Sequence, residues 1–360
     1  MSAPLYLDAN ATEPLRPAAR AAVLAAMDTG GNPSSVHAAG RAARRLLEEA
    51  REAVAARFGA RPQDVVFTGG GTEANALALR GLSAGRRLLV GATEHPAVLA
   101  AAPGAGVLPV LADGRLDPAA LEGALAQGGP ALVALMAANN ETGVLHPLEA
   151  AAELCRRHGA LLHVDAVQAA GRVAVPAVWD SLAISGHKLG GPPGAGALLL
   201  RAGMDVAPLI AGGGQERGRR GGTEPLPAIA GMAAALAEAT PEAASRLAAL
   251  RDAIEAGATG AVVAGAGAAR LPNTSCLVLP GVAAETQVIA LDIAGFRVSA
   301  GAACSSGKVA RSPVLQAMGL GEAAGCGIRV SLPWNAPDDA AERFLLAWAA
   351  MRDRLSRRAA

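Results

Sequence analysis

The chain has 360 residues and a formal net charge of +1, with 32 basic and 31 acidic side chains. No overall electrostatic field therefore attracts it to nucleic acid or to acidic membranes. One Tyr, four Phe and three Trp leave little aromatic surface for stacking on bases, so nucleic-acid binding is not indicated. The apolar fraction of 52% is typical of a globular protein, and the length allows a large domain with a smaller one.

The N-terminus and the cysteines favour a cytoplasmic protein. The segment "MSAPLYLDANATEPL" lacks the basic stretch and apolar core of a secretory signal. Alanine-rich stretches are interrupted by charges before the ~18 residues that a membrane span needs. The four cysteines (Cys155, Cys276, Cys304, Cys326) form no C-x-x-C pair, which argues against a zinc site or a redox dithiol. We expect a soluble protein of the reducing cytoplasm, with no membrane contact and no metal in its resting state.

Short apolar runs alternate with helical patterns between residues 60 and 200. Strand-length runs are found at 64–68, 87–91, 107–111, 131–136, 160–165, 181–185 and 195–201. Helical patterns with start or stop signals lie between them at 72–82, 117–126 and 147–159. Several runs are too continuously hydrophobic for a sheet with one wet face. The alternation predicts an α/β domain with a largely parallel sheet, covered on both faces.

The pattern changes from about residue 226. Long helical patterns at 226–257 and 338–357 surround strand candidates at 274–280 and 328–332. The stretch "ATPEAASRL" within the first pattern indicates a helix restart rather than a linker. We expect a large domain of residues 12–240 and a smaller α+β domain of residues 1–11 and 241–360.

Polar residues and glycines follow the predicted strands, where ligands bind in open α/β sheets. Gly69-Gly70-Gly71-Thr72 comes between a strand and a helix, where backbone N–H groups and the helix dipole favour a phosphate. The loop matches neither a P-loop nor G-x-G-x-x-G, and a tight turn also needs glycine. The other strand ends carry Glu94-His95, Asn139-Asn140, Asp165 with Gln168, and Ser185-Gly186-His187-Lys188. A single residue of this kind is usually a cap or a turn residue, but five positions together indicate a site.

Lys188 is unusual because the chain contains only two lysines, Lys188 and Lys308, against 30 arginines. Arginine stays protonated, whereas a buried lysine amine can lose its proton and act as a nucleophile or base. Pyridoxal phosphate needs such an amine for its Schiff base, a phosphate cradle, and a carboxylate at its pyridinium nitrogen. Asp165 is the candidate carboxylate, and the glycines around Lys188 allow close approach of the cofactor.

Motifs along almost the whole chain resemble the NifS/IscS-type cysteine desulfurases of the class V aminotransferase superfamily, which have the fold-type I of pyridoxal-phosphate enzymes. The segments that carry the resemblance are "YLDANAT" (6–12), "GNPSSVHAAGRAAR" (31–44), "FTGGGTEAN" (67–75), "TEHPAVL" (93–99), "NNETGV" (139–144), "HVDAVQAAG" (163–171), "SGHKLGGPPGAGAL" (185–198), "GGGQERGRRGGTE" (212–224), "SAGAACSSGKVARSPVLQAMGL" (299–320) and "IRVSL" (328–332).

The resemblance implies a role for each matching residue. Lys188 would carry the Schiff base, Asp165 would pair with the pyridinium nitrogen, and Gln168 would contact the ring hydroxyl. His95 would stack on the ring and shuttle protons. The phosphate would be held by Gly71, Thr72, Ser185, Gly186 and His187, with Thr223 reaching the cofactor of the other subunit of a homodimer. Asn140 would contact cofactor or substrate, and Arg329 would bind the substrate carboxylate, for which the alternative is a structural ion pair.

The resemblance also implies the reaction, conversion of L-cysteine to L-alanine with the sulfur passing to an enzyme cysteine. Cys304 lies in "SAGAACSSGK", a small, glycine-containing setting suited to a mobile loop, and a thiolate is a strong nucleophile. The persulfide would then supply an iron–sulfur scaffold or another sulfur acceptor, with Cys304 a possible transient ligand of the cluster. Cys155 and Cys276 are expected to be packing residues, and Cys326 is favoured as structural although it lies close to Arg329.

Three alternatives stay open. One is a selenocysteine lyase or another pyridoxal-phosphate lyase or aminotransferase on the same scaffold, although Cys304 argues against an aminotransferase. Another is a non-catalytic protein that retains the fold, against which the presence of Lys188, Asp165, His95 and Cys304 speaks. The last is a metal-binding module, which the cysteine spacing does not support. The sulfur acceptor and the preference between sulfur and selenium are not determined by the sequence.

Overall fold

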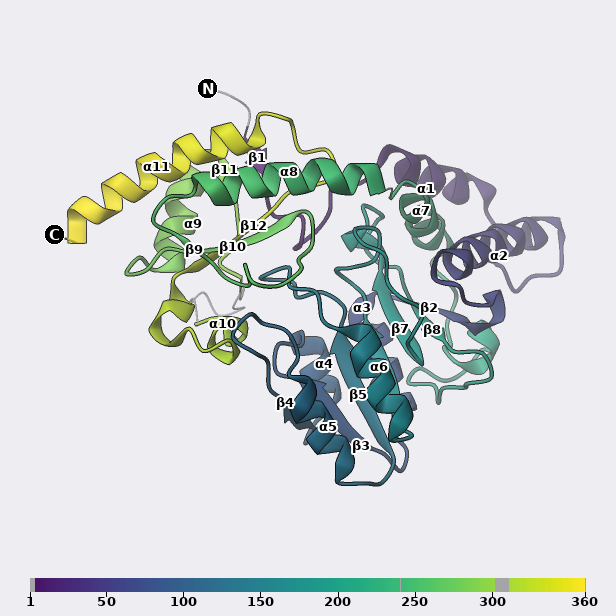
Figure 1. Cartoon of the computed structure of the whole chain (residues 1–360). Helices are drawn as coiled ribbons and strands as arrows, with labels where there is room; N and C mark the ends of the chain where they lie inside the picture. The colour runs from purple at the N-terminus through teal and green to yellow at the C-terminus, as the bar shows by residue number, and fades with distance from the viewer. Residues whose placement is uncertain (1–3, 240, 302–310, 360) are drawn as a thin grey trace.

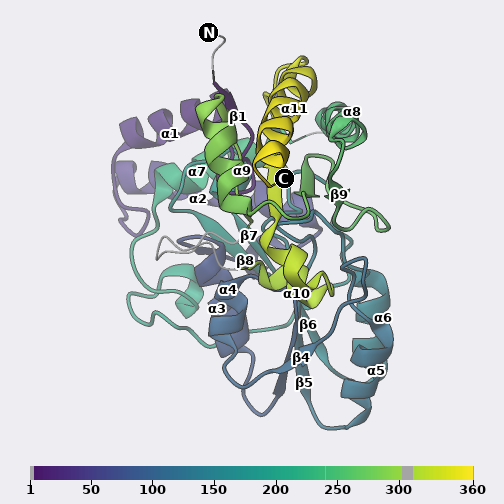
Figure 2. The same ribbon diagram turned by 90° about the vertical axis from the view of Figure 1, so that its left-hand side faces the viewer.

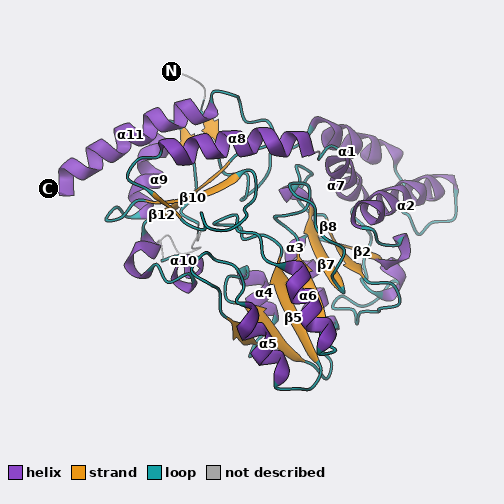
Figure 3. Ribbon diagram, viewed as in Figure 1, coloured by secondary structure: helices purple, strands orange, loops and turns teal. Residues whose placement is uncertain are grey.

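The computed structural model describes residues 4–239, 241–301 and 311–359, and its largest feature is a seven-stranded sheet (Figures 1 and 3). In spatial order the strands are β2 (Val65–Thr68), β8 (Gly196–Leu200), β7 (Ser181–Ser185), β6 (Leu161–Asp165), β5 (Ala131–Met136), β3 (Arg87–Gly91) and β4 (Gly106–Leu108). The strands from β7 to β4 are mutually parallel, whereas β8 is antiparallel to both β7 and β2. The predicted α/β architecture with a mostly parallel sheet is confirmed.

Helices cover both faces of this sheet, as the continuous hydrophobicity of its strands predicts. Along β5, Val133 and Leu135 belong to one buried cluster and Leu132 and Ala134 to another, because successive side chains point to opposite faces. The first face packs against α1 (Pro17–Thr29), α2 (Ala38–Phe58), α5 (Pro118–Ala126), α6 (Leu148–Arg157) and α7 (Leu226–Ala237). The second face packs against α3 (Gly71–Gly81) and α4 (Pro96–Ala101).

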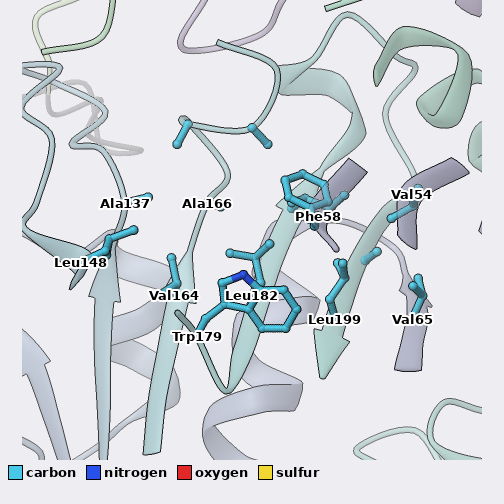
Figure 4. Packing of buried hydrophobic residues seen from close by; sticks show 14 of the residues in the cluster. Val54, Phe58, Val65, Ala137, Leu148, Val164, Ala166, Trp179, Leu182 and Leu199 are labelled. Carbon is cyan, nitrogen blue, oxygen red and sulfur yellow. The ribbon is translucent and has the colours of Figure 1, made fainter. Parts of the chain in front are cut away.

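The first cluster is built mainly from aliphatic side chains with a few aromatic rings. Figure 4 shows Leu182 and Leu199 from neighbouring strands beside Phe58 of α2 and Trp179, which precedes β7. Leu182 and Leu199 are fully buried. This packing fixes the strands whose ends carry the candidate site residues.

The C-terminal third forms a second, smaller assembly beside the large sheet (Figure 2). Its strands are β9 (Val262–Val263), β10 (Thr274–Val278) and β12 (Gly327–Ser331) in an antiparallel sheet, and β1 (Leu5–Tyr6) paired with β11 (Phe296–Arg297). Its helices are α8 (Pro241–Gly257), α9 (Ala284–Ile293), α10 (Pro313–Ala317) and α11 (Ala340–Ala359). Phe344 and Trp348 belong to a separate hydrophobic cluster that includes Leu7. The domain bounds at residues 12 and 240 stay a prediction.

Two predicted elements differ in detail from the structure. The strand expected at 107–111 is β4, which ends at Leu108 because Pro109 follows and has no N–H for the ladder. The helical pattern at 226–257 is divided into α7 and α8, and α8 begins at Pro241, where the expected restart lies. In the described ranges no helix combines the length and apolarity needed to cross a bilayer.

Candidate active site

A cavity of about 700 Å³ lies where the carboxyl ends of the sheet strands meet the smaller assembly. Ten of the predicted site residues line it: Gly71, Thr72, His95, Asn140, Asp165, Gln168, Ser185, His187, Lys188 and Arg329. The parallel strands explain this convergence, since their carboxyl ends share one edge of the sheet.

Lys188 lies at the end of a single 3-10 turn, Gly186–Lys188, that follows β7 directly. Its Nζ donates hydrogen bonds to the backbone oxygens of Asn10 at 2.7 Å and Ala11 at 2.6 Å. Burial lowers the pKa of Lys188 to about 8, and the nearby guanidinium groups of Arg329 and Arg172 act in the same direction. About a tenth of the amine is therefore unprotonated, and nucleophilic, at pH 7, far more than for an ordinary lysine.

Asp165 ends β6 and is buried at the floor of the cavity. Its Oδ1 accepts a hydrogen bond from the Val167 N–H at 2.9 Å, and its Oδ2 accepts one from Asn75 Nδ2 at 2.7 Å. Burial raises the pKa of Asp165, while these two donors oppose that shift. The carboxylate is thus held in one orientation by two donors, and it could pair with a protonated ring nitrogen.

Gln168 lies one turn beyond Asp165, and its side-chain amide is held at both ends. Its Nε2 donates to the Asn10 backbone oxygen at 3.0 Å, and its Oε1 accepts from Arg172 Nη1 at 2.5 Å. Arg172 is itself buried in an ion pair with Glu13. The amide is therefore oriented by segments more than 150 residues apart in sequence.

The pKa values of the two cavity histidines are both lowered. His95 is the N-cap of α4, and its Nδ1 accepts from the Ala97 N–H at 3.1 Å, so its proton is on Nε2. Burial lowers the pKa of His95. Burial, followed by the charge of Lys188, lowers the pKa of His187 to about 4, and its Nδ1 lies 2.8 Å from Thr12 Oγ1.

The glycine loop before α3 leaves room for an anion at the helix N-terminus. A Cβ built on Gly71 would lie 2.6 Å from Val167 Cγ2, so no side chain fits there. Gly70 has a φ of +153°, a conformation that favours glycine. Thr72 and Ser185 add hydroxyl groups to the same wall of the cavity. Backbone donors, hydroxyls and the helix dipole together could hold a phosphate.

Arg329 reaches the cavity from β12 of the smaller assembly. Its Nη2 donates to Asp8 Oδ1 at 2.6 Å and its Nη1 to the Asn140 backbone oxygen at 3.1 Å. Its buried Nε has no hydrogen-bond partner. Arg329 thus forms the ion pair that was one of its two predicted roles. It also keeps an unused donor beside a cavity that could take a carboxylate, as the other role requires.

Three predicted site residues do not line the cavity in the structure. Gly186 is buried behind it, where a Cβ would lie 3.1 Å from the Met232 side chain. Thr223 is exposed, in the loop that follows the 3-10 turn Gln215–Gly218. Cys304 lies outside the described residues, although Gly301 and Arg311 on either side of the gap both line the cavity.

The remaining cysteines are poor nucleophiles or lie away from the cavity. Burial raises the pKa of both Cys155 and Cys276 to about 12, so their thiols stay protonated at neutral pH. Cys326 is partly buried and does not line the cavity. Across the described ranges, no group of three or more His, Cys, Asp or Glu side chains is arranged to hold a metal ion.

Two buried acids of the cavity were given no role from the sequence. Glu94 accepts from the Met136 N–H at 2.7 Å, and burial raises its pKa well above the ordinary value. Glu141 accepts from Ser312 Oγ at 2.5 Å, and burial raises its pKa as well. Both stand inside quoted motifs beside His95 and Asn140, but only their burial distinguishes them from ordinary loop acids.

Residues 5–344 match the aminotransferase class-V family, a match that runs through both assemblies and the whole cavity. The chain belongs to the class-V aminotransferase family. Class-V relatives are similar over nearly the full length. A cysteine desulfurase from Cereibacter sphaeroides is 46% identical over 352 residues, covering 91% of this chain and 90% of the relative. An IscS-like cysteine desulfurase from Mycobacterium tuberculosis is 39% identical, covering 91% of each.

Solved structures agree with this class-V assignment. The X-ray structure of a NifS-like protein from Rickettsia africae superposes with a TM-score of 0.90 at 33% identity, covering 97% of this chain and 99% of that one. The resemblance to the NifS/IscS-type group and the corresponding fold, expected from the motifs, are confirmed.

Proposed function

We propose that the protein is a cysteine desulfurase that uses pyridoxal 5'-phosphate to convert L-cysteine to L-alanine. The observation that carries the proposal is the half-buried amine of Lys188, whose pKa is lowered to about 8, in one cavity with Asp165 and the N-terminus of α3. Relatives up to 46% identical that bear this name support the same conclusion.

The residues of the cavity fit the cofactor in size and in chemistry. Lys188 would hold it covalently, Asp165 would face its ring nitrogen, and Gln168 would face its ring hydroxyl. Gly71, Thr72, Ser185 and His187 would surround its phosphate, with Gly186 shaping the turn behind them. The position of Gly71 on the cavity wall, packed too closely against Val167 for any side chain, and the orientation of the Asp165 carboxylate support this assignment. When bound, pyridoxal phosphate supplies an electron sink that stabilises negative charge on the Cα of an amino acid.

The remaining groups would bind the substrate and move its protons. Arg329 would take the L-cysteine carboxylate, using its free Nε together with donors now engaged by Asp8 and Asn140. The Lys188 Nζ would remove the Cα proton, because its lowered pKa makes the amine a base near neutral pH. The neutral His95, with its proton on Nε2, would stack on the ring and exchange protons with the substrate thiol.

Cys304 would be the sulfur acceptor. Its thiolate would attack the substrate sulfur, so that the carbon–sulfur bond breaks, its electron pair stays on the carbon, and a sulfur–sulfur bond forms. The atoms balance: L-cysteine and the Cys304 thiol give L-alanine and a persulfide on Cys304. The persulfide sulfur would then pass to an iron–sulfur scaffold or another acceptor, with Cys304 a possible transient cluster ligand.

The proposal includes a homodimer in which Thr223 reaches the phosphate in the partner's cavity. Thr223 is exposed and does not line the cavity of its own chain, which supports this arrangement. We also propose the cytoplasm as the compartment, because the Cys304 thiol needs a reducing environment.

The experiment compares L-cysteine with L-selenocysteine as substrate for the purified, cofactor-loaded protein, with alanine as the measured product. The proposal predicts that L-cysteine leaves a persulfide on the enzyme. It also predicts that alanine is formed from L-cysteine and not from L-selenocysteine alone. Alanine from L-selenocysteine alone would instead identify a selenocysteine lyase. Bound cofactor without alanine from either amino acid would leave only a scaffold that retains the fold.

A further inference from the structure

A series of three buried polar side chains leads from Asp165 into the core, and its first member, Asn75, also lines the cavity. Ser181 Oγ lies 2.9 Å from His163 Nδ1, and His163 Nε2 lies 2.8 Å from Asn75 Oδ1. Asn75 Nδ2 then donates to Asp165 Oδ2 at 2.7 Å. Ser181 begins β7, His163 lies opposite it on β6, and Asn75 comes from α3, which packs on these strands.

The donors and acceptors in this series of hydrogen bonds can be assigned in only one way, with each side chain donating toward Asp165. Because Asn75 gives its amide N–H to the Asp165 carboxylate, its Oδ1 must accept, and His163 must carry its proton on Nε2. A neutral imidazole then has an unprotonated Nδ1, which accepts the Ser181 hydroxyl proton. Burial lowers the pKa of His163 to about 3, so the ring is neutral throughout the physiological range.

These polar groups lie in surroundings that would suit apolar ones. His163 and Ser181 are fully inaccessible and Asn75 is 2% exposed, with Ala74, Ala78 and Ala183 of the second cluster nearby in sequence. Burying polar side chains costs free energy unless every donor and acceptor is satisfied. Here each polar side-chain atom has a hydrogen-bond partner, and the series ends on the Asp165 carboxylate.

We propose that Ser181, His163 and Asn75 form a positioning relay that keeps Asp165 ionised and oriented toward the ring nitrogen of the cofactor. Asn75 lines the cavity, whereas His163 and Ser181 do not. His163 and Ser181 would therefore act on Asp165 only through Asn75. The inference rests on the proposed function in one respect, that the group bound in the cavity is pyridoxal phosphate.

Other ionisable groups also act on Asp165 and must stay unchanged in a test. His95 and Lys188 face it from the cavity, and Glu94 lies near enough to interact with it through space. The relay differs from these groups because it reaches Asp165 by a direct hydrogen bond from within the core. Substitutions at His163 therefore change the relay and leave the cavity wall intact.

The test measures the ¹⁵N chemical shift of the ring nitrogen in the holoenzyme loaded with ¹⁵N-labelled pyridoxal phosphate, together with the cofactor concentration for half-saturation. His163→Leu removes the donor to Asn75, and we expect the resonance to move toward the unprotonated ring and half-saturation to rise roughly tenfold or more. His163→Gln can still donate from its amide to Asn75, and it should restore values near those of the wild type.

Val164→Ala is the matched control, because Val164 is equally buried on the same strand but faces the opposite cluster. It should lower thermal stability without moving the nitrogen resonance. If His163→Leu does not fold, Asn75→Ala removes the donor to Asp165 directly and should move the resonance in the same direction. An unchanged resonance in the folded variants overturns the relay. A wild-type protein that takes up no pyridoxal phosphate overturns the proposed function itself.

Discussion

At the scale of single residues, Lys188 is the position where the sequence was most informative. Its rarity among 30 arginines indicated a chemical need for a primary amine, and the structure surrounds it with the burial that lowers its pKa. The partners of the site residues could not be predicted in the same way. The ion pair of Arg329 with Asp8 joins residues 321 positions apart, and no local pattern in the sequence encodes it.

The pKa of Lys188 predicts how the cofactor-free protein reacts with pyridoxal phosphate as the pH changes. Only the unprotonated amine attacks an aldehyde, so the rate should rise with pH through a midpoint near 8 and level off above it. Stopped-flow absorbance of cofactor binding measures this rate. A midpoint near the ordinary lysine value of 10.5 would contradict the account.

Lys188→Arg should abolish the reaction although it keeps the positive charge. A guanidinium neither forms the covalent link to the cofactor nor removes a proton near neutral pH, and loss of a general base alone costs about a hundredfold or more in rate. Alanine formation from L-cysteine and the visible absorbance of the cofactor are the measurements. Activity within a few-fold of the wild type would exclude Lys188 as the essential amine.

At the scale of elements, the strand ends were predictable and the connections between assemblies were not. Periodicity gave the strands, and the rule for parallel sheets gathered Gly71, His95, Asn140, Asp165 and Lys188 at one edge. The contributions of Asp8 and of β12 to the cavity depend on how the two assemblies pack, which strand patterns do not specify. The role of His163 could not be predicted either, because the sequence shows it only as one residue within a predicted strand.

Gly71→Ala tests the proposed phosphate-binding role of the turn at the start of α3. Its Cβ would lie 2.6 Å from Val167 Cγ2 and 3.3 Å from Ser185 Cβ, so the turn must shift and cofactor affinity should fall about tenfold. Equilibrium binding of pyridoxal phosphate gives the affinity. Gly123→Ala is the control, because Gly123 lies in α5 with open space around its Cβ position and should leave binding unchanged. Equal affinities of the two variants for pyridoxal phosphate would show that the turn at Gly71 does not bind the phosphate.

At the scale of the whole molecule, the 3-10 turn Gln215–Gly218, which precedes the exposed Thr223, is anchored to α2. Glu216 in this turn has a φ of 47° and is buried in a two-point ion pair with Arg51 of α2, at 2.7 and 2.8 Å. Such a backbone conformation costs about 1–3 kcal/mol and persists only where surrounding contacts enforce it. The turn before Thr223 is therefore held against α2, and Thr223 itself lies exposed at the surface.

Mixed dimers test whether Thr223 completes the cavity of a partner subunit. Lys188→Ala and Thr223→Val should each lower activity, but a heterodimer of the two has one cavity with Lys188 and a wild-type Thr223 from the other chain. After mixing under exchange conditions, we expect each heterodimer to show about half of the wild-type activity. No recovery after exchange, verified by native mass spectrometry, would show that Thr223 does not act across an interface.

The measurement that tests the central claim most directly is the release of alanine from L-cysteine by the wild type and by Cys304→Ala, both loaded with cofactor and supplied with a thiol reductant. The account predicts alanine from the wild type, with the persulfide mapped to Cys304 by mass spectrometry, and no alanine from the variant. Equal alanine from both proteins, or a persulfide on Cys326 instead, would contradict it.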